Sequence, residues 1–355
     1  LPPNICRLPC LTTYTASFFN TYKLPIPSIL HSLKKLYVLQ PDEIFISTPG
    51  PVGLLGLIIA RLMHIPCKGV YHTDFTDYAQ TIIDDPAITS MTREYVKWFY
   101  SQCNTIYVPT LEYISLLANR GYNPKKMKRF LRAVDKNVFS PQKIPYDYLE
   151  QKYSIKPGIN ILYVGRISRE KNIDHLFNIY FQLKKQNEVL NLILCGNGPL
   201  FEEYREKYRK ENRVYLLGRL GRNELPSIYT AADLLVFPST TDTFGMAVLE
   251  AQACGLPAIV SNKGGPQEII LDTVTGYTAK HESVSDWVEK INKILNFIEL
   301  YPEQYLEMRF RACKMVESKY NWDNVLKNLF NYNKPVIYTQ LSNITKRKIP
   351  TEILV

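Results

Sequence analysis

The stretch that decides the fold is VFPSTTDTFGMAVLEAQACGLPAIVSNKGGPQEII, residues 236–270. Its first residues end an apolar run typical of a buried strand, and FGMAVLEAQAC (244–254) has the pattern of a helix that ends at Gly255. The helix is apolar nearly all round and is therefore predicted to be buried. Two carboxylates break the pattern, Asp242 just before the helix and Glu250 inside it. A buried carboxylate needs a partner, so the stretch predicts a ligand site where a strand passes into a helix.

The start of this helix has the properties of a phosphate site. The first N–H groups, at Gly245, Met246 and Ala247, lack intrahelical partners, and Gly245 has no side chain to block a ligand. A phosphate of a sugar nucleotide fits that position. The ribose hydroxyls would then satisfy Glu250, and hydroxyls of the transferred sugar would donate to Asp242. Two plainer interpretations stay open, in which Asp242 is a helix N-cap and Glu250 belongs to an internal ion pair.

Short apolar runs alternate with helical patterns in the N-terminal half of the chain and again in the C-terminal half. The runs predicted to be strands are 42–48, 67–73, 104–110, 159–165, 190–196, 213–218, 233–239 and 256–261, with one more strand and its exit loop in 128–141. Such alternation indicates a parallel sheet with right-handed crossovers, and 355 residues suffice for two such units. The sequence therefore predicts an α/β protein of two Rossmann-like domains facing a cleft, with the ligand beyond the carboxyl ends of the strands.

A polar segment with three prolines, PQKIPYDYLEQKYSIKPG, interrupts this alternation. Domain boundaries fall in segments of this composition, so we place the link between the domains there. The predicted divisions are an N-terminal, acceptor-side domain at 1–140, a linker at 141–158, a C-terminal, nucleotide-sugar-binding domain at 159–310, and C-terminal helices crossing back with a tail at 311–355.

Two cations and a histidine stand at other strand exits. Arg166 leaves the strand at 159–165, and Lys171 precedes the next helix. Two cations beside a helix N-terminus suit a diphosphate, although an ordinary pair of surface cations has the same pattern. His72 lies at a strand exit in the other half and would face the donor sugar across the cleft, unless it is a structural histidine.

Three further motifs are less specific. The glycines of GNGP (196–199) permit a tight turn, either beside a ligand or an ordinary one. The segment STPGPVG (47–53) opens a helix that binds an anion or acceptor, or is only a turn. The spacing in HTDFTD (72–77) matches no standard set of metal ligands, so we predict no metal site.

Composition and charge narrow the class of protein. Hydrophobic residues make up 46% and charged residues 21%, as in soluble globular proteins, and no apolar run is long enough to span a membrane. Seven scattered cysteines and no visible secretory signal indicate free thiols in a reducing compartment, so we expect a cytoplasmic protein. The net charge is +10, with basic clusters at 123–130 and 345–348. These clusters indicate solvated surface or peripheral contact with an anionic membrane or ligand, and no nucleic-acid signature accompanies them.

Taken together, GRISREKN, GNGP, YHTDF and the stretch at 236–270 resemble the glycosyltransferases of family 4, which have the GT-B fold. The segments STPGPVGLLG and STTDTFG resemble one subgroup in particular. That subgroup includes GDP-mannose-dependent α-mannosyltransferases and the sulfoquinovosyltransferases of glycolipid synthesis. The resemblance covers roughly residues 1–335 and is most specific in the second half.

The resemblance implies retaining, metal-independent transfer of a hexose, mannose-type favoured. The donor would be a GDP- or UDP-linked sugar, the acceptor a lipid or glycan, and no cofactor would be needed. His72 would lie beside the reacting sugar, and Asp242 stands at the first position of the family's acidic pair, where Glu is usual. The implied nucleotide-sugar-binding residues are Arg166, Lys171, Gly245, Met246, Ala247 and Glu250.

One departure from the family concerns the N-terminal domain. The family's first βα unit, whose glycine-rich loop faces donor and acceptor, has no counterpart in this sequence, so the domain is expected to be incomplete. The departure leaves a second interpretation beside the enzyme, namely a non-catalytic sugar-nucleotide-binding module of a larger protein.

Overall fold

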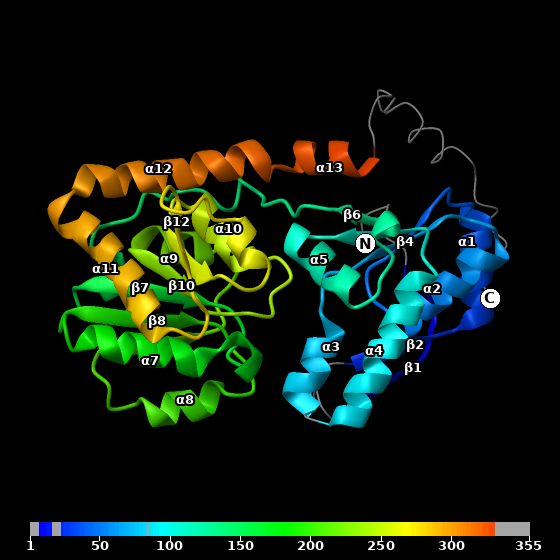
Figure 1. Cartoon of the computed structure of the whole chain (residues 1–355), viewed down its shortest axis with the longest axis horizontal. Helices are drawn as coiled ribbons and strands as arrows, with labels where there is room; N and C mark the ends of the chain where they lie inside the picture. Colours follow the sequence, from blue (N-terminus) through cyan, green and yellow to red (C-terminus); the bar gives the residue numbers. More distant parts are fainter. Residues whose placement is uncertain (1–6, 16–22, 84, 331–355) are drawn as a thin grey trace.

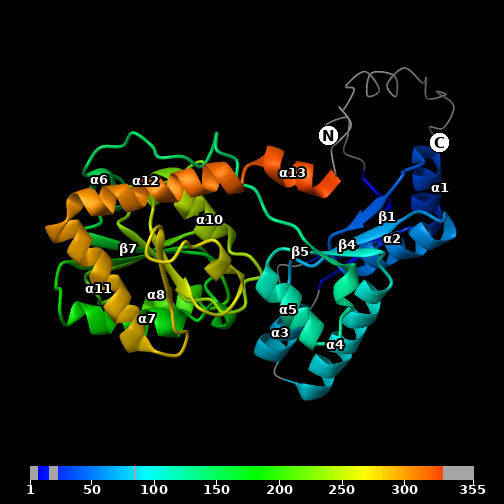
Figure 2. The same ribbon diagram turned by 45° about the horizontal axis from the view of Figure 1, so that its top comes forward.

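The computed structural model describes residues 7–15, 23–83 and 85–330. Within them the chain forms two α/β lobes, a blue-to-cyan N-terminal lobe and a green-to-yellow C-terminal lobe, which lie side by side in both views (Figure 1, Figure 2). Each lobe is built on a parallel sheet, as predicted. The basic cluster at 345–348 lies outside the described residues.

The N-terminal lobe contains a parallel sheet in the order β3-β4-β5-β6. Its strands are β3 (Ile44–Ile46), β4 (Cys67–Val70), β5 (Thr105–Val108) and β6 (Met127–Arg129). Its helices are α2 (Pro51–Leu62), α3 (Phe75–Tyr78), η1 (Ala79–Ile83), α4 (Pro86–Ser101), α5 (Leu111–Asn119) and η2 (Pro124–Lys126). One face of the sheet packs on α2, α4 and α5 through a core that includes Leu57, Phe99 and Leu117. Each strand starts within two residues of the start of a predicted apolar run, because these runs supply that buried face.

An antiparallel hairpin precedes this sheet, and the sequence pattern did not indicate it. Strand β1 (Cys10–Thr15) pairs with β2 (Lys23–Pro27), and α1 (Ile29–Leu39) follows. Proline normally argues against a strand, and β2 contains two. Within the part of the chain that the structure describes, the hairpin forms a sheet of its own.

The C-terminal lobe contains a parallel sheet in the order β12-β11-β10-β7-β8-β9. Its strands are β7 (Ile159–Val164), β8 (Leu190–Cys195), β9 (Val214–Gly218), β10 (Leu234–Phe237), β11 (Ala258–Ser261) and β12 (Gly276–Ala279). The helices around it are α6 (Tyr148–Tyr153), η3 (Arg169–Lys171), α7 (Ile173–Lys184), α8 (Phe201–Lys207), α9 (Leu225–Ala231), α10 (Met246–Ala253) and η4 (Gly265–Glu268). The first five strands were predicted. The sixth, β12, was missed because its sequence GYTA is too short for an apolar run.

The C-terminal helices pack along the C-terminal lobe and reach the junction of the lobes. They are α11 (Val284–Leu300), α12 (Pro302–Lys319) and α13 (Trp322–Phe330). Helix α12 packs against α10 and α11, and the orange-red α13 continues toward the N-terminal lobe in both views (Figure 1, Figure 2). The backbone N–H of Val134, in the segment after β6, donates to the carbonyl of Tyr320, between α12 and α13. The division proposed at residue 310 falls inside α12. Among the described helices, none has both the length and the apolar character that crossing a membrane requires.

Candidate functional site

The loop after β7 is held by the glycine motif after β8. The N–H of Gly165 donates to the carbonyl of Cys195 at 3.0 Å, and the N–H of Ile167 donates to the carbonyl of Asn197 at 3.1 Å. A Cβ on Gly196 would lie 1.8 Å from the Gly165 oxygen, so only glycine allows this approach. The motif GNGP is therefore more than an ordinary turn, because it positions the backbone that carries Arg166.

Arg166 lies at the junction of the two lobes. Its guanidinium stands 6.0 Å from the centre of the Tyr78 ring, which belongs to α3 of the N-terminal lobe. One guanidinium nitrogen lies 3.9 Å from the Glu170 carboxylate, and 46% of the Arg166 side chain is exposed. A guanidinium that lies over an aromatic ring and is nearly half exposed is well placed to bind a diphosphate.

Lys171 and Asp242 form an ion pair with each other. The Lys171 Nζ lies 2.8 Å from the Asp242 carboxylate, and Lys171 is buried. Burial lowers the pKa of the Lys171 ammonium, but the charge and hydrogen bond of Asp242, together with Tyr78 and Glu170, outweigh that effect and the pKa is raised. Asp242 is not the N-cap of α10, since that position is Gly245. The structure thus joins the two residues that the sequence assigned to different parts of the donor.

The first turn of α10 starts from a glycine with a positive φ and has no side-chain cap. Gly245 has a φ of 96°, and a Cβ there would lie 2.8 Å from Cγ of Pro266. Its carbonyl accepts the N–H of Leu249 at 3.1 Å, so the intrahelical bonds begin there. The N–H groups of Met246 and Ala247 precede the first donor of that ladder and suit an anion.

Glu250 is partly buried on α10 and has a tyrosine as its partner. The fully buried Tyr229 of α9 donates its hydroxyl to the Glu250 carboxylate at 3.2 Å, in place of the cation of an internal ion pair. Burial raises the pKa of Glu250 to about 7, although the Tyr229 hydrogen bond and the charge of Arg222 both act to lower it. A carboxylate with one neutral donor retains acceptor capacity for the hydroxyls of a ligand.

His72 comes directly against the loop before α10. The Thr243 hydroxyl donates to the His72 carbonyl at 2.8 Å, which brings the two strand exits together. The His72 Nδ1 lies 3.3 Å from the Val70 carbonyl, a hydrogen bond when Nδ1 carries the proton. Burial lowers the pKa of His72, an effect that the Val70 hydrogen bond opposes and the charge of Arg132 increases, so the neutral ring is favoured. The Nε2 atom then remains as an acceptor.

Helix α5 of the N-terminal lobe holds the residues on either side of Asp242. The Thr110 hydroxyl donates to the Thr243 carbonyl at 3.2 Å, and the Tyr113 hydroxyl donates to the Thr241 carbonyl at 3.1 Å. Sequence reasoning missed both residues, because their partners lie more than a hundred positions away and no local pattern marks them. The only available signal was that Thr110 is the last residue of the predicted strand run at 104–110.

Beside this contact, the carboxylates of Glu112 and Glu268 each accept a backbone N–H from the other lobe. The Glu112 carboxylate accepts the N–H of Gly264 at 2.8 Å, and the Glu268 carboxylate accepts the N–H of Glu112 at 2.7 Å. Arg129 pairs with the same Glu268 at 2.7 Å. These bonds hold the strand exits of one lobe against those of the other.

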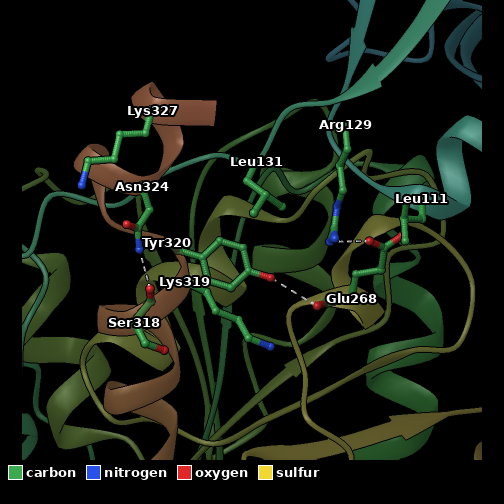
Figure 3. A pocket seen from close by; sticks show the side chains of 9 residues that line it. All are labelled: Leu111, Arg129, Leu131, Glu268, Ser318, Lys319, Tyr320, Asn324 and Lys327. Carbon is green, nitrogen blue, oxygen red and sulfur yellow. Dashed lines mark hydrogen bonds and ion pairs between the residues drawn. The ribbon is translucent and has the colours of Figure 1, made fainter. Parts of the chain in front are cut away.

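A pocket of about 770 Å³ lies beside these carboxylates, where both lobes meet the C-terminal helices (Figure 3). Figure 3 shows Arg129 directed at Glu268 and Leu131 beside Tyr320. The residues that line it are Leu111, Arg129, Leu131, Glu268, Ser318, Lys319, Tyr320, Asn324 and Lys327. None of the predicted site residues is among them, so the pocket is separate from the proposed donor site.

The two acidic residues in HTDFTD, Asp74 and Asp77, both pair with an arginine of the same lobe. Asp74 is fully buried and accepts hydrogen bonds from the Tyr71 hydroxyl at 3.0 Å and from Arg120 at 2.7 Å. The same arginine reaches Asp77 at 2.8 Å. This network anchors α3, whose last residue, Tyr78, carries the ring under Arg166. No group of three His, Cys, Asp or Glu suited to a metal occurs in the described part of the chain.

The basic cluster at 123–130 is only partly free surface. Lys126 donates to the carbonyls of Ser101 and Cys103 at 2.8 and 3.0 Å, and Arg129 is paired with Glu268. The exposed cations that remain are Lys125 and Lys128. The cluster therefore offers fewer charges to a membrane or ligand than its sequence suggests.

Comparison with known proteins identifies a family model, sequences and solved structures that are similar to this chain. Residues 149–304 match the family model described as Glycosyl transferases group 1. A GDP-mannose-dependent alpha-mannosyltransferase of Corynebacterium glutamicum is 28% identical over 88% of this chain and 71% of its own length. The sulfoquinovosyl transferase SQD2 of Arabidopsis thaliana is 25% identical over 80% of this chain and 54% of its own length. Among solved structures, Anabaena Alr3699/HepE in complex with UDP has a TM-score of 0.69 at 17% identity, over 89% of this chain and 82% of that chain.

Proposed function

This chain carries a glycosyl transferases group 1 domain in a GT-B fold, as its motifs predicted, and we propose that the protein is a retaining, metal-independent hexosyltransferase with a nucleotide-diphosphate sugar as donor. The observation that carries the proposal is one cluster of groups. Arg166, the Lys171–Asp242 pair and the first turn of α10 lie at the carboxyl ends of neighbouring strands, β7 and β10. Ligands of open α/β sheets bind at that edge.

The chemistry follows from where charge develops. As the glycosidic bond breaks, negative charge builds on the leaving diphosphate. Arg166, Lys171 and the N–H groups of Met246 and Ala247 are positive groups aimed at that position, and they stabilise the charge without a metal ion. A diphosphate needs no general acid as a leaving group, and its oxygen is the base we propose for the acceptor hydroxyl.

The other assignments concern the sugar, the ribose and the acceptor. When the diphosphate takes Lys171, the Asp242 carboxylate becomes free to accept hydroxyls of the sugar, while Glu250 accepts those of the ribose. His72, from the other lobe, stands beside the sugar. A mannose-type donor linked to GDP is favoured by the mannosyltransferase relative, with UDP as the alternative. The acceptor is proposed as a lipid or glycan reached from the N-terminal lobe, on the cytoplasmic side and with peripheral contact to an anionic membrane.

The test of this proposal is a donor panel. Thermal shifts with GDP- and UDP-linked sugars identify the donor, and transfer to glycolipid and glycan acceptors is then followed by NMR of the product anomeric centre. The expected result is stabilisation by one nucleotide sugar and a product with the donor's anomeric configuration. Inverted configuration would refute the retaining chemistry. Stabilisation without transfer to any acceptor would instead favour a sugar-nucleotide-binding module.

Asp242→Asn should separate nucleotide binding from transfer. Asparagine cannot pair ionically with Lys171, which then meets the diphosphate without a competitor, so affinity for the free nucleoside diphosphate should rise about two- to fivefold. Transfer should fall at least about tenfold, because the charged acceptor for the sugar hydroxyls is gone. Calorimetry and initial rates measure the two effects. Transfer at the wild-type rate by Asp242→Asn would show that the carboxylate does not bind the sugar.

Transfer should persist in a chelator. The cations and helix N-terminus that face the leaving diphosphate are part of the protein, so removal of divalent ions should leave the rate within about twofold. Rates with EDTA, before and after addition of magnesium or manganese, check this. A rate that collapses in EDTA and returns with either metal would contradict the proposal.

A further inference from the structure

Arg132 is a partly buried cation that has no acidic partner among the residues that the structure describes. It follows β6 in the N-terminal lobe, and its guanidinium lies 5.9 Å from the centre of the Phe130 ring. Burial lowers the pKa of Arg132, with no neighbouring carboxylate to raise it. Arg120, by contrast, forms ion pairs with two aspartates, Asp74 and Asp77. A desolvated cation without a counter-charge is costly, so the position suits an anion that comes from outside the chain.

The direction of the Arg132 side chain follows from its neighbours. The N–H of Phe130 donates to the carbonyl of Val108, so the strand pairing with β5 continues past Arg129. Arg129 and Leu131 line the pocket of Figure 3. Alternate residues of an extended chain point to opposite sides, which places Phe130 and Arg132 on the other side, consistent with their ring contact.

The same face of the sheet leads to His72. Tyr71 at the end of β4 belongs to the core under the sheet, so the next residue, His72, is expected on the opposite side. Tyr107 of β5 pairs in register with Val70 of β4, two residues before His72, and its ring centre is 5.7 Å from that of Phe130. Burial is the main cause of the lowered His72 pKa, and the Arg132 charge contributes in the same direction. Arg132 and His72 therefore share one face and one end of the sheet.

We propose that Arg132 binds an anionic group of the acceptor, so that the acceptor is a phosphate-bearing molecule. This inference rests on the proposed function and adds the chemical class of its second substrate. A guanidinium offers paired N–H donors that match phosphate oxygens. The donor's own phosphates already have Arg166, Lys171 and the α10 N-terminus in the other lobe. An acceptor phosphate on Arg132 would hold the acceptor beside His72, where the sugar is expected.

The test uses glycerol 3-phosphate as the probe and glycerol as its uncharged counterpart, and it needs no transfer activity. The chain has only five histidines, so the imidazole proton signals can be followed by NMR, with His72 assigned by loss of its signal in His72→Gln. Titrations are run on the wild type, on Arg132→Gln and on Lys128→Gln, each with and without saturating nucleoside diphosphate. Lys128→Gln is the matched control, because it removes one exposed cation from β6, the strand that Arg132 follows.

Glycerol 3-phosphate should shift the His72 signal of the wild type and of Lys128→Gln and raise the His72 pKa, because it neutralises the Arg132 charge. Arg132→Gln should bind the probe at least about tenfold more weakly. Glycerol should not shift the His72 signal, and nucleoside diphosphate should not displace glycerol 3-phosphate. Equal binding by Arg132→Gln, displacement by the nucleotide, or no effect of the probe on wild-type His72 would each overturn the inference. A Tm for Arg132→Gln below that of Lys128→Gln would likewise count against it, because it would point to a structural role.

The two proposals fail in different ways. If no sugar is transferred but the probe binds through Arg132, the anion site stands and the activity does not. If transfer is found, phosphate-bearing and neutral acceptors of the same lipid chain are compared in the wild type and in Arg132→Gln. The transfer rate of Arg132→Gln should fall at least about tenfold with the phosphate-bearing acceptor and should not fall with the neutral one. An equal loss with both acceptors would refute the assignment of Arg132.

Discussion

Changing Arg166 and Lys171 together to alanine should abolish binding of the nucleoside diphosphate, with a loss of at least about a hundredfold in affinity. Each cation is expected to make a charge-assisted hydrogen bond worth about 1.5–3 kcal/mol, and a factor of ten corresponds to about 1.4 kcal/mol. The loss includes a second effect, because Asp242 is left without its partner and repels the diphosphate. Calorimetry with the donor's nucleoside diphosphate measures it.

The matched control for this variant is Arg205→Ala with Lys207→Ala. These residues lie on α8 of the same lobe, and the double change removes the same net charge. Its affinity should stay within about twofold of the wild type, because surface cations contribute little. Adding Asp242→Asn to the Arg166 and Lys171 variant should recover part of the affinity, since it removes the unpaired carboxylate. If the variant with Arg166 and Lys171 changed to alanine still binds the nucleoside diphosphate with a nanomolar to micromolar Kd, these two residues do not form the diphosphate site.

Glu250 should make nucleotide affinity depend on pH around neutrality. Its pKa is raised to about 7 by burial, so at pH 6 most of the carboxyl group is protonated in the ligand-free protein. Ribose hydroxyls are proposed to bind the ionised form, so affinity should fall by up to about tenfold per pH unit below 7. Glu250→Gln should weaken binding about tenfold or more at pH 8 and remove this part of the dependence.

The comparison between variants isolates this carboxyl group from the titration of the nucleotide, which is common to both. Tyr229→Phe is a second check, because loss of a hydrogen bond that lowers the pKa of Glu250 should move the profile to higher pH. If the wild type and Glu250→Gln show parallel pH profiles, Glu250 does not titrate at the nucleotide site.

The raised pKa of Glu250 also predicts that the free energy of unfolding changes with pH. The folded-state pKa of Glu250 lies above the value of 4.5 expected for an exposed carboxyl group, so the folded protein retains a proton that the unfolded chain has lost between these pH values. The stability that this proton contributes is therefore present below pH 4.5 and is lost as the pH rises through 7. Glu250→Gln should be more stable than the wild type at pH 8, by at most about 3 kcal/mol, and the difference should shrink toward pH 5.

The strands and the buried helix of this protein could be predicted because their signals are local. Apolar runs such as ILYV and LLVF are typical of strands buried in a parallel sheet, and α10 is apolar nearly all round, so its burial was expected from composition. The strand exits then followed from topology, and with them the positions of Arg166 and Asp242. The hairpin β1–β2 and the edge strand β12 were missed, since prolines in one and the shortness of the other hide them from any local pattern.

What the sequence by itself determined is therefore the alternation of strands and helices, the two parallel sheets and the set of polar residues at their ends. Only the tertiary structure decided how those residues meet. It paired Lys171 with Asp242 across 71 positions, placed Tyr78 of one lobe under Arg166 of the other, and left Arg132 without a counter-charge. The physical reason is that an ion pair depends on distance in space, and residues far apart in the chain come close only when both sheets and their junction have formed.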